Sequence, residues 1–188
     1  MSESLSSTDA SRFRSAANSY CMLLNERAPV PPAVWAQRVQ LALAQLYAAG
    51  LSLADIEPDT SLVETAPLDA GTFRERQGTI AALLGRWDIY SSVFDPYDDS
   101  DAEVLTGSLA LDLAEIHSDV SRALRFEVTA AAATPQDVLW SWRFDFQSHW
   151  GRHAIVAMNA LHMALQFHYA AALPESFGQP IQSVPPAL

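Results

Sequence analysis

The residues best placed for chemistry are three polar side chains in the C-terminal third of the chain, Asp145, His149 and His153. They follow one another at intervals of four residues, so on a helix all three project along one side. Two histidines at positions i and i+4 are a known metal-binding geometry, and a nearby carboxylate could add a ligand. The stretch lacks the glutamate of a zinc protease and the Glu-x-x-His repeats of di-iron bundles. A metal site would therefore need further acidic ligands from upstream, namely Asp112, Glu115 or Asp119.

A structural role explains the same residues, and it is the one we favour. At 100° per residue, His149 and His153 fall on the apolar side of the helix, and Arg143 also lies away from its polar strip. A guanidinium keeps its charge when buried, and a buried imidazole still needs its two nitrogens satisfied. The pattern predicts a buried network in which Arg143 pairs with Asp112 or Asp119, while the histidines bond carboxylates or backbone. A pocket for a small ligand or an anion, and a metal centre, are the alternatives.

Aromatic residues flank this cluster. Trp140, Trp142 and Trp150 could line a ligand pocket, although aromatic residues at this spacing on an apolar helix are more typical of a core. Other motifs for chemistry are missing. No serine of this stretch lies in a Gly-x-Ser-x-Gly turn, and a chain without lysine cannot hold a P-loop. The single cysteine, Cys21, falls in an expected buried helix and is interpreted as inert.

The element that positions these residues is expected to be one long helix over residues 134–167. Thr134 suits the N-cap, Pro135 the first helical position, and Asp137 the place where a carboxylate meets unpaired backbone N–H groups. A polar strip keeps its phase across Gly151, which favours one helix, bent at the glycine, over two. Because nearly everything off the strip is apolar, we expect other helices to surround it. The strip consists of Ser141, Asp145, Ser148, Arg152, Asn159 and Gln166.

Four further helices are expected upstream. In each of four segments, apolar residues recur at helical spacing and prolines or glycines lie near the ends. The segments are residues 9–27, 33–49, 72–94 and 106–128. Thr72 and Glu75 fit a capping box at the third helix, and Thr106 or Ser108 can cap the fourth.

These elements predict an all-α fold, a single-domain antiparallel bundle of about five helices with a long, central C-terminal helix. Residues 1–8 are expected to be a flexible N-terminus, and residues 9–172 the domain. Residues 173–188 are rich in proline and are expected to form an extended or disordered tail.

An acidic run between the third and fourth helices invites a calcium interpretation. It consists of Asp95, Asp98, Asp99, Asp101 and Glu103. An EF-hand loop beginning at Asp99 would place Val104 where the turn glycine belongs and Ala110 at the twelfth position, so the pattern fails. A solvated acidic loop that precedes a helix N-terminus, where it favours the helix dipole, is the better interpretation.

Composition restricts the class of protein. The 188 residues include 22 acids and 11 basic residues, all of them arginine, for a net charge of −11. A chain this acidic is repelled by nucleic acid and by anionic membrane surfaces, so neither is an expected partner. No run of about 18 apolar residues occurs, and the first residues lack the apolar core of a signal peptide. With one cysteine, these features predict a cytoplasmic protein.

Three segments carry a resemblance. The segment WSWRFDFQSHWGRH, preceded by WDIYSSVFDP and GSLALDLAEIHSDV, resembles an uncharacterised bacterial family, one of the domains of unknown function. The likeness extends from about residue 12 to residue 168 and is strongest over residues 140–153. The resemblance implies an all-helical fold and carries no catalytic assignment.

Two functions follow as expectations. The first is a non-enzymatic module that binds a protein partner or associates with itself, and it predicts an exposed apolar patch of several hundred Å². The second is a small-ligand- or metal-binding domain, which could be enzymatic, built on Arg143, His149, His153 and acidic partners. It predicts a solvent-connected pocket with perturbed pKa values. The sequence assigns no cofactor.

Overall fold

The structure, a computed structural model, describes residues 2–26, 30–60, 69–93, 104–129 and 133–169. All five residues of the acidic run and the whole of the predicted tail, residues 173–188, lie outside these ranges. Helices dominate the rest, and the prediction of an all-α fold with a long C-terminal helix is confirmed. The elements in chain order are α1 Ser2–Asn25, α2 Pro32–Leu51, α3 Ala70–Leu84, η1 Gly85–Trp87, β1 Ile89–Val93, β2 Val104–Ser108, α4 Leu109–Thr129, α5 Pro135–Asp145, η2 Phe146–Trp150, α6 Gly151–Met163 and η3 Ala164–Tyr169.

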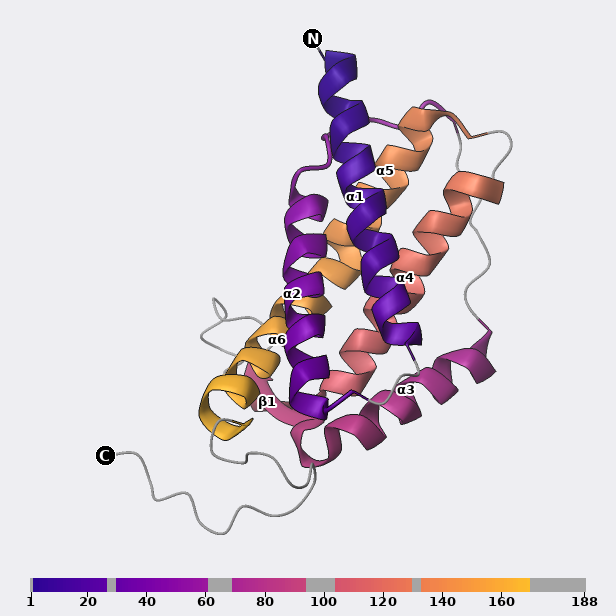
Figure 1. Cartoon of the computed structure of the whole chain (residues 1–188). Helices are drawn as coiled ribbons and strands as arrows, with labels where there is room; N and C mark the ends of the chain where they lie inside the picture. Colours follow the sequence, from indigo (N-terminus) through magenta and orange to yellow (C-terminus); the bar gives the residue numbers. More distant parts are fainter. Residues whose placement is uncertain (1, 27–29, 61–68, 94–103, 130–132, 170–188) are drawn as a thin grey trace.

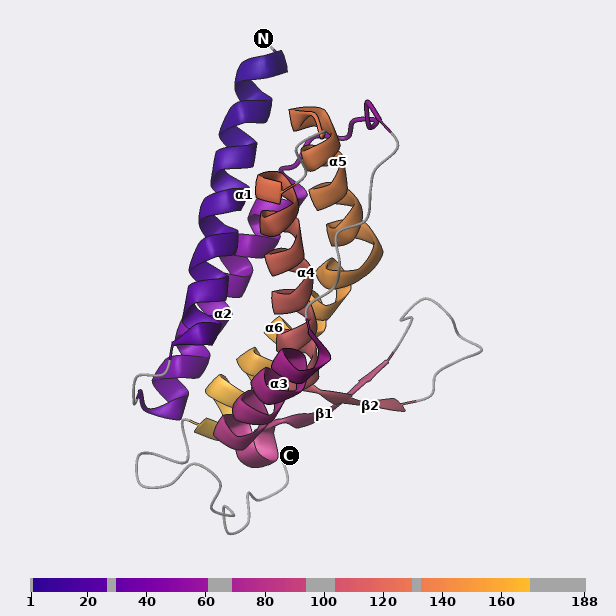
Figure 2. The same cartoon turned by 90° about the vertical axis from the view of Figure 1, so that its right-hand side faces the viewer.

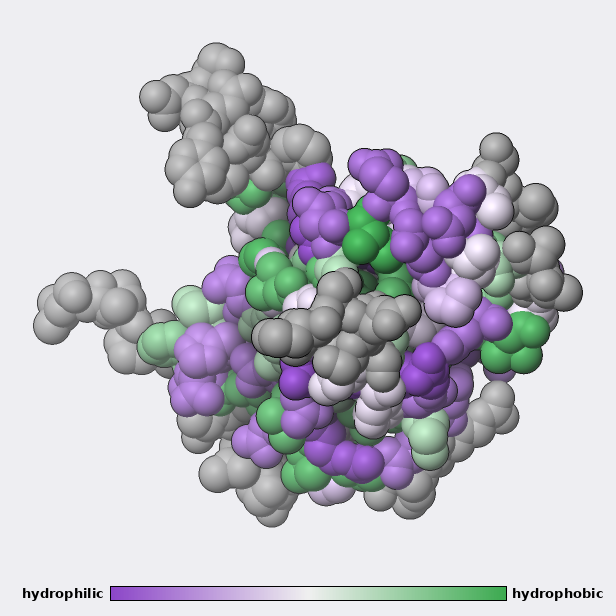
Figure 3. Space-filling model, turned by 90° about the horizontal axis from the view of Figure 1, so that it is seen from above, coloured by the Kyte–Doolittle hydropathy of each residue, from purple (hydrophilic) through white to green (hydrophobic). Residues whose placement is uncertain are grey.

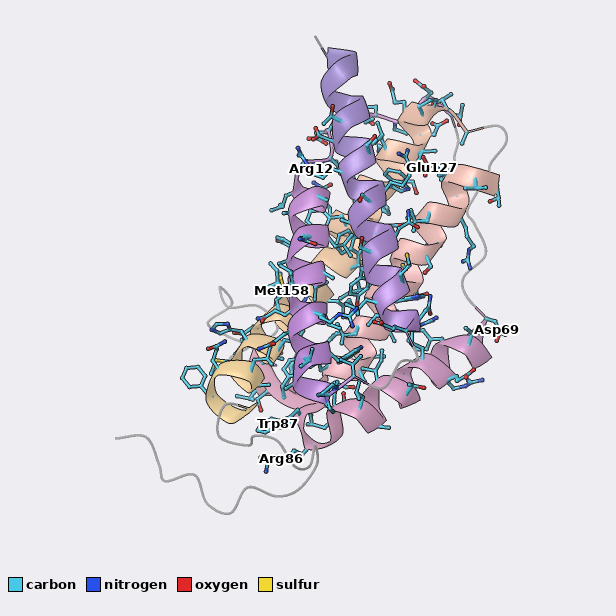
Figure 4. The ribbon with its side chains drawn as sticks, in the orientation of Figure 1. Arg12, Asp69, Arg86, Trp87, Glu127 and Met158 are labelled. Carbon is cyan, nitrogen blue, oxygen red and sulfur yellow. The ribbon has the colours of Figure 1, made fainter. Side chains whose placement is uncertain are left out.

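The bundle consists of α1, α2, α4 and the C-terminal helix, with α3 across its lower end (Figure 1). Helix α1 packs on α2 and α4, and α6 packs on the same two helices from the other side. Fully buried Phe13, Leu43 and Leu113 therefore meet residues of the C-terminal helix in one core. A bidentate ion pair from Arg14 to Glu127 also ties α1 to α4, and Figure 4 shows Glu127 beside α1.

The C-terminal helix is continuous through Gly151, as its polar phase predicted. Its start has the predicted capping box, in which the Thr134 hydroxyl accepts from Asp137 N and the Asp137 carboxylate accepts from Thr134 N. Two π-helical segments, η2 and η3, interrupt the α-helical hydrogen bonding. The helix contacts α2 and α4, and its outer face exposes Phe144 and Ile155 to about half of their full areas. Apolar residues off the polar strip are therefore not all buried.

The predicted third helix is wrong beyond Leu84. Helix α3 ends there because Gly85 adopts φ 55°, a left-handed conformation that favours glycine. Residues 89–93 then form a strand instead of the last helical turns. The N-cap is also different, since the Asp69 carboxylate accepts from Thr72 N at 3.0 Å, and Asp69 lies at the beginning of α3 in Figure 4. The predicted capping box at Thr72 is therefore replaced by a cap three residues earlier.

The two strands form an antiparallel ribbon, which we call the β1–β2 ribbon. Figure 2 shows it projecting from the lower end of the bundle beside α3. Its register pairs Ile89 with Ser108 and Val93 with Val104. Asp88 ties the ribbon to α4: its carbonyl accepts from Leu109 N at 2.7 Å, and its carboxylate accepts from Ala110 N at 2.7 Å. Residue 108 caps α4 as predicted, since the Ser108 hydroxyl accepts from Leu111 N.

The first helix begins earlier than its apolar pattern indicates. Helix α1 starts at Ser2, whereas the sequence predicted a helix from Asp9 after a flexible lead. Ser2–Thr8 thus extends the helix beyond the predicted start, at the end marked N in Figure 1. Apolar periodicity identifies only the residues that pack, so it does not by itself locate the first residue of a helix.

Candidate functional site

Two buried carboxylates on α4 form the base of the candidate site. Asp112 and Asp119 are 6% and 4% exposed, in a helix whose other buried residues are mostly apolar. They lie seven residues apart, which is two helical turns, so both face the same neighbour. That neighbour is the C-terminal helix. A buried carboxylate is costly unless a cation or hydrogen-bond donors satisfy it, so both residues require partners there.

The partners are the two histidines. His149 Nδ1 lies 2.6 Å from Asp119 Oδ2, and His153 Nδ1 lies 2.8 Å from Asp112 Oδ1. An ionised carboxylate only accepts hydrogen bonds, so Nδ1 carries the proton in both imidazoles. The ring centroids are 4.8 Å apart with their planes at 67°. We call these two pairs, together with the residues that contact their carboxylates, the His–Asp cluster.

Tyr90 of β1 completes one pair. Its hydroxyl donates to Asp112 Oδ2 at 2.5 Å, so Asp112 uses both oxygens. Burial, followed by the hydrogen bond to Asp112, raises the pKa of the Tyr90 phenol well above 10, which keeps the phenol a donor. The ring crosses strand β2 at Gly107, where a β-carbon would lie 2.4 Å from the Tyr90 ring. A glycine at this position therefore allows the phenol to reach α4.

Arg122 completes the other pair. Its Nη2 lies 3.2 Å from Asp119 and 3.1 Å from Asp145. Burial raises the pKa of the Asp145 carboxyl, and the charge of Arg122 opposes this effect. Asp145 therefore joins the cluster through the guanidinium, and His149 also acts on its carboxyl electrostatically. Glu115, an expected metal ligand, makes none of these contacts.

The histidines are not enclosed, contrary to the predicted buried network. The His149 and His153 side chains are 48% and 27% exposed, while their aspartates are almost completely buried. None of the hydrogen bonds of the described residues engages Nε2 of either imidazole. Each imidazole is thus held through one ring nitrogen, Nδ1, by a buried carboxylate.

Arg143 lies outside the cluster, so its predicted pairing with Asp112 or Asp119 was wrong. The guanidinium donates to the Leu53 carbonyl and lies 3.3 Å from Asp55, a residue whose side chain is 87% exposed. Arg143 precedes the π-helical segment η2. Because a π-helical turn holds more residues than an α-helical turn, the side chains after η2 are rotated about the helix axis relative to those before it. A single α-helical phase over the whole stretch therefore misplaces Arg143 relative to the histidines.

The two tryptophans belong to the core and not to a pocket. Trp142 and Trp150 are 1% and 0% exposed. The Phe13 ring lies 4.8 Å from the Trp142 ring and 6.2 Å from the Trp150 ring. Trp142 Nε1 donates to the Ala123 carbonyl at 3.0 Å. Both residues thus pack α1 against the C-terminal helix, as is typical of aromatic residues at helical spacing.

A second polar cluster lies between α1 and α4. His117 Nδ1 is 3.2 Å from the Ser121 hydroxyl, which is 3.4 Å from Cys21 Sγ. Burial, helped by the charges of Arg76 and Arg125, lowers the pKa of His117 to about 4, so the imidazole is neutral at pH 7. Burial also raises the pKa of the Cys21 thiol, which favours the thiol over the reactive thiolate.

Sequence reasoning missed three residues of the site: Tyr90, Gly107 and Arg122. Tyr90 was interpreted as part of a helical stripe, because its strand pairs with a segment that follows more than ten residues later. Arg122 could have been found, since a basic residue three positions after Asp119 is a neighbour on a helix. In the described part of the chain, no group of three or more His, Cys, Asp or Glu residues is placed to hold a metal.

The class defined by this geometry is a helical bundle with a small antiparallel ribbon and a His–Asp cluster between α4 and the C-terminal helix. The family model described as "Domain of unknown function (DUF5063)" matches residues 5–167, and the chain belongs to this family. The resemblance seen in the sequence is therefore confirmed. No curated protein matches the chain.

A solved structure has the same fold. The crystal structure of protein BF1032 from Bacteroides fragilis matches with a TM-score of 0.70 and 18% sequence identity. The match covers 85% of this chain and 93% of that chain. Among the described helices of the present protein, none is long and apolar enough to cross a membrane.

Proposed function

We propose that this protein is a non-enzymatic interaction module whose partner is a second copy of the chain and whose contact surface is the β1–β2 ribbon. One observation carries the proposal: the outer face of the ribbon exposes three large apolar side chains, which lie beside Ser91, Thr106 and Ser108. Ile89, Val93 and Val104 are 60%, 44% and 65% exposed. Their alternation along the ribbon places them on one face, while Tyr90 faces the bundle and bonds Asp112.

The ribbon lacks the features that normally prevent strands from pairing with other chains. Such features are charged side chains, prolines and bulges. The sequences IYSSV and VLTGS contain no charge and no proline, and their five-pair register has no bulge. In the described part of the chain the sheet has two strands, so each strand has one unpaired edge. An antiparallel copy of the same strand could pair with that edge.

The two strands of the ribbon carry no charged side chain. The chain carries a net charge of −11, so two copies repel one another over most of their surfaces. A contact confined to the two strands brings no charged side chains directly together, while the segment 94–103 that connects them in sequence holds five acids. By contrast, hydrophilic residues surround small separate hydrophobic groups on the face of the molecule seen in Figure 3.

A neighbouring hollow enlarges the apolar surface. Val93 also lines a cavity of about 560 Å³ together with Leu51 of α2 and Ile155 of α6. Leu51 and Ile155 are 60% and 50% exposed. A stable interface buries roughly 1,000 Å² or more in total, which the edge of a five-residue strand cannot supply alone. Val93 belongs to both the ribbon and the cavity, whose lining is mostly apolar but includes Gln147 and Arg152, so the second copy could contact both.

Sedimentation velocity over a range of concentrations, in the presence of EDTA, tests the proposal. Wild type should pass from monomer to dimer as concentration rises, and Val104→Lys should stay monomeric because the lysine places a charge on the ribbon face. Leu41→Lys is the matched control, since Leu41 is 62% exposed on α2, away from the ribbon. A monomeric wild type, or a dimer that is equally stable in Val104→Lys, would contradict the proposal.

The other function expected from sequence loses part of its support. A metal or small-ligand site built on Arg143, His149 and His153 loses Arg143, which faces Asp55 instead. The side chains of these two histidines are nevertheless partly exposed, and this observation is independent of the ribbon. The cytoplasmic location and the absence of nucleic-acid partners stay predictions.

A further inference from the structure

We propose that His149 and His153 bind one divalent transition-metal ion, of which Zn²⁺ is the test case, through their Nε2 atoms. The proposal does not depend on self-association through the ribbon. It starts from the orientation of the two rings, because each Nδ1–H is held by a buried carboxylate. The proton is thereby fixed on Nδ1, and the lone pair of Nε2 points away from the aspartate.

This is the orientation that metal-binding histidines require. Such histidines usually donate one ring N–H to a carboxylate, which orients the ring and increases the basicity of the other nitrogen. Here two imidazoles have that arrangement, four residues apart on one helix, with ring centroids 4.8 Å apart. Because Zn–N bonds are about 2.0–2.1 Å long, rings this close can share one ion. Nitrogen donors favour zinc, copper or nickel over magnesium or calcium.

The local charge also favours a dication. With neutral imidazoles, the carboxylates of Asp112, Asp119 and Asp145 carry three negative charges, and Arg122 supplies one positive charge. These groups together carry a net negative charge that attracts a cation, and the guanidinium of Arg152, whose charge acts on Tyr90, offsets part of it. Arg152 lies between the two histidines in sequence, but it is exposed, so water screens its repulsion of a cation.

The remaining coordination positions face solvent. His149 is 48% exposed and His153 27%, so an ion can enter from the surface. No third His, Cys, Asp or Glu in the described ranges is placed to join the two histidines. The two imidazoles would thus be the protein ligands and water would fill the other positions, which is one protein ligand fewer than in the usual catalytic zinc site.

Isothermal titration of the full chain with ZnCl₂ at pH 7.5 tests the proposal. Wild type should bind one Zn²⁺ per chain, and His149→Ala/His153→Ala should lose this binding. His162→Ala is the control, because His162 is an exposed histidine on the same helix. Asp112→Asn and Asp119→Asn should each weaken binding by roughly 10- to 100-fold, the usual effect of removing the carboxylate behind a metal-bound histidine.

A second measurement needs no substitution and therefore does not depend on the variants folding. In long-range ¹H–¹⁵N imidazole spectra of wild type, Zn²⁺ should shift the Nε2 signals of His149 and His153 and leave those of buried His117 unchanged. Far-UV circular dichroism establishes that each variant is folded. Retention of stoichiometric Zn²⁺ by the folded double variant, or absence of Zn²⁺ binding by wild type, would overturn the proposal.

Discussion

A β-carbon on Gly151 would lie 2.4 Å from the carbonyl oxygen of Phe146 and 2.9 Å from its ring. Phe146 is the first residue of the π-helical segment η2, and Gly151 is the first residue after it. The wider turn brings a carbonyl to the position that a side chain would otherwise occupy. Glycine is therefore the residue that lets the helix pass from α5 through η2 to the two histidines.

Gly151→Ala should lower the free energy of unfolding by about 1–3 kcal/mol, because the added methyl group cannot fit without a backbone shift. Gly78→Ala is the matched control. Gly78 is an exposed helical glycine with nothing within 4 Å of a built β-carbon, so alanine there should stabilise the protein by about 0.5–1 kcal/mol. Urea denaturation measures both. Equal stability of Gly151→Ala and wild type would mean that the close approach does not exist.

His117 should make the protein less stable in mild acid. Burial and two arginines lower the pKa of His117 in the folded state to about 4, against 6.5 for the unfolded chain. Between these values the unfolded state binds the proton more readily, so stability is full above pH 6.5 and declines as pH falls toward 4. The contribution is about 3 kcal/mol, since one pKa unit corresponds to about 1.4 kcal/mol.

His117→Gln removes the titrating group and provides the comparison. Urea denaturation of wild type and variant at pH 7.5 and pH 4.5 should show that the variant loses about 2–3 kcal/mol less stability over this interval. Identical losses in both proteins would show that His117 is accessible to protons in the folded state.

Protonation of Asp137 should destabilise the fold at a lower pH than protonation of His117. Burial alone would raise the pKa of this carboxyl, but hydrogen bonds from Thr134 and Thr60 lower it to about 2. A carboxyl with a lowered pKa stabilises the fold above the unfolded value of 3.8, and the stabilisation is lost as pH falls toward 2. Asp137 also accepts from Asp59 N at 2.8 Å, so it joins the segment after α2 to the start of α5.

Asp137→Asn should destabilise the protein at pH 7 and flatten the acid unfolding curve between pH 4 and pH 2. An amide group brings N–H donors toward the backbone N–H groups that the carboxylate satisfied. Asp69→Asn, at the N-cap of α3, is the control and should leave stability nearly unchanged because asparagine caps as well as aspartate. Circular dichroism during an acid titration measures the unfolding curves. If the curves of Asp137→Asn and wild type are parallel between pH 4 and pH 2, Asp137 is not the group responsible for this loss of stability.

Arg143→Ala should cost only about 1 kcal/mol, because Arg143 faces an exposed aspartate and a backbone carbonyl. The pairing with a buried aspartate predicted from sequence would have cost about 3–5 kcal/mol. Chemical denaturation of the variant distinguishes the two. A loss of stability above 3 kcal/mol would instead support the pairing of Arg143 with a buried aspartate.

The parts of the site that sequence could predict depend either on local geometry or on a buried polar group that requires a partner. The cap formed by Thr134 and Asp137 follows from adjacent residues, and a buried Asp119 needs a partner such as His149. The orientation of Arg143 could not be predicted, because the packing around Gly151 determines whether a turn is α or π.

The ribbon could not be predicted for a different reason. The spacing of Ile80, Leu84 and Trp87 continues a helical pattern into Tyr90, and only pairing with a distant segment shows that the chain has become a strand. Helix periodicity is a property of one segment, whereas a strand needs a partner strand with the correct register. For this reason Tyr90, which holds Asp112, was assigned to the wrong element.

Asp88 joins the ribbon to α4, and this has a consequence for local opening of the fold. The amide protons of Leu109 and Ala110 have their acceptors on Asp88, at the residue that precedes strand β1. Any fluctuation that detaches the ribbon also exposes these amides to solvent. Ribbon and first turn of α4 should therefore exchange their hydrogens with deuterium as one cooperative unit, at a rate that the rest of α4 does not share.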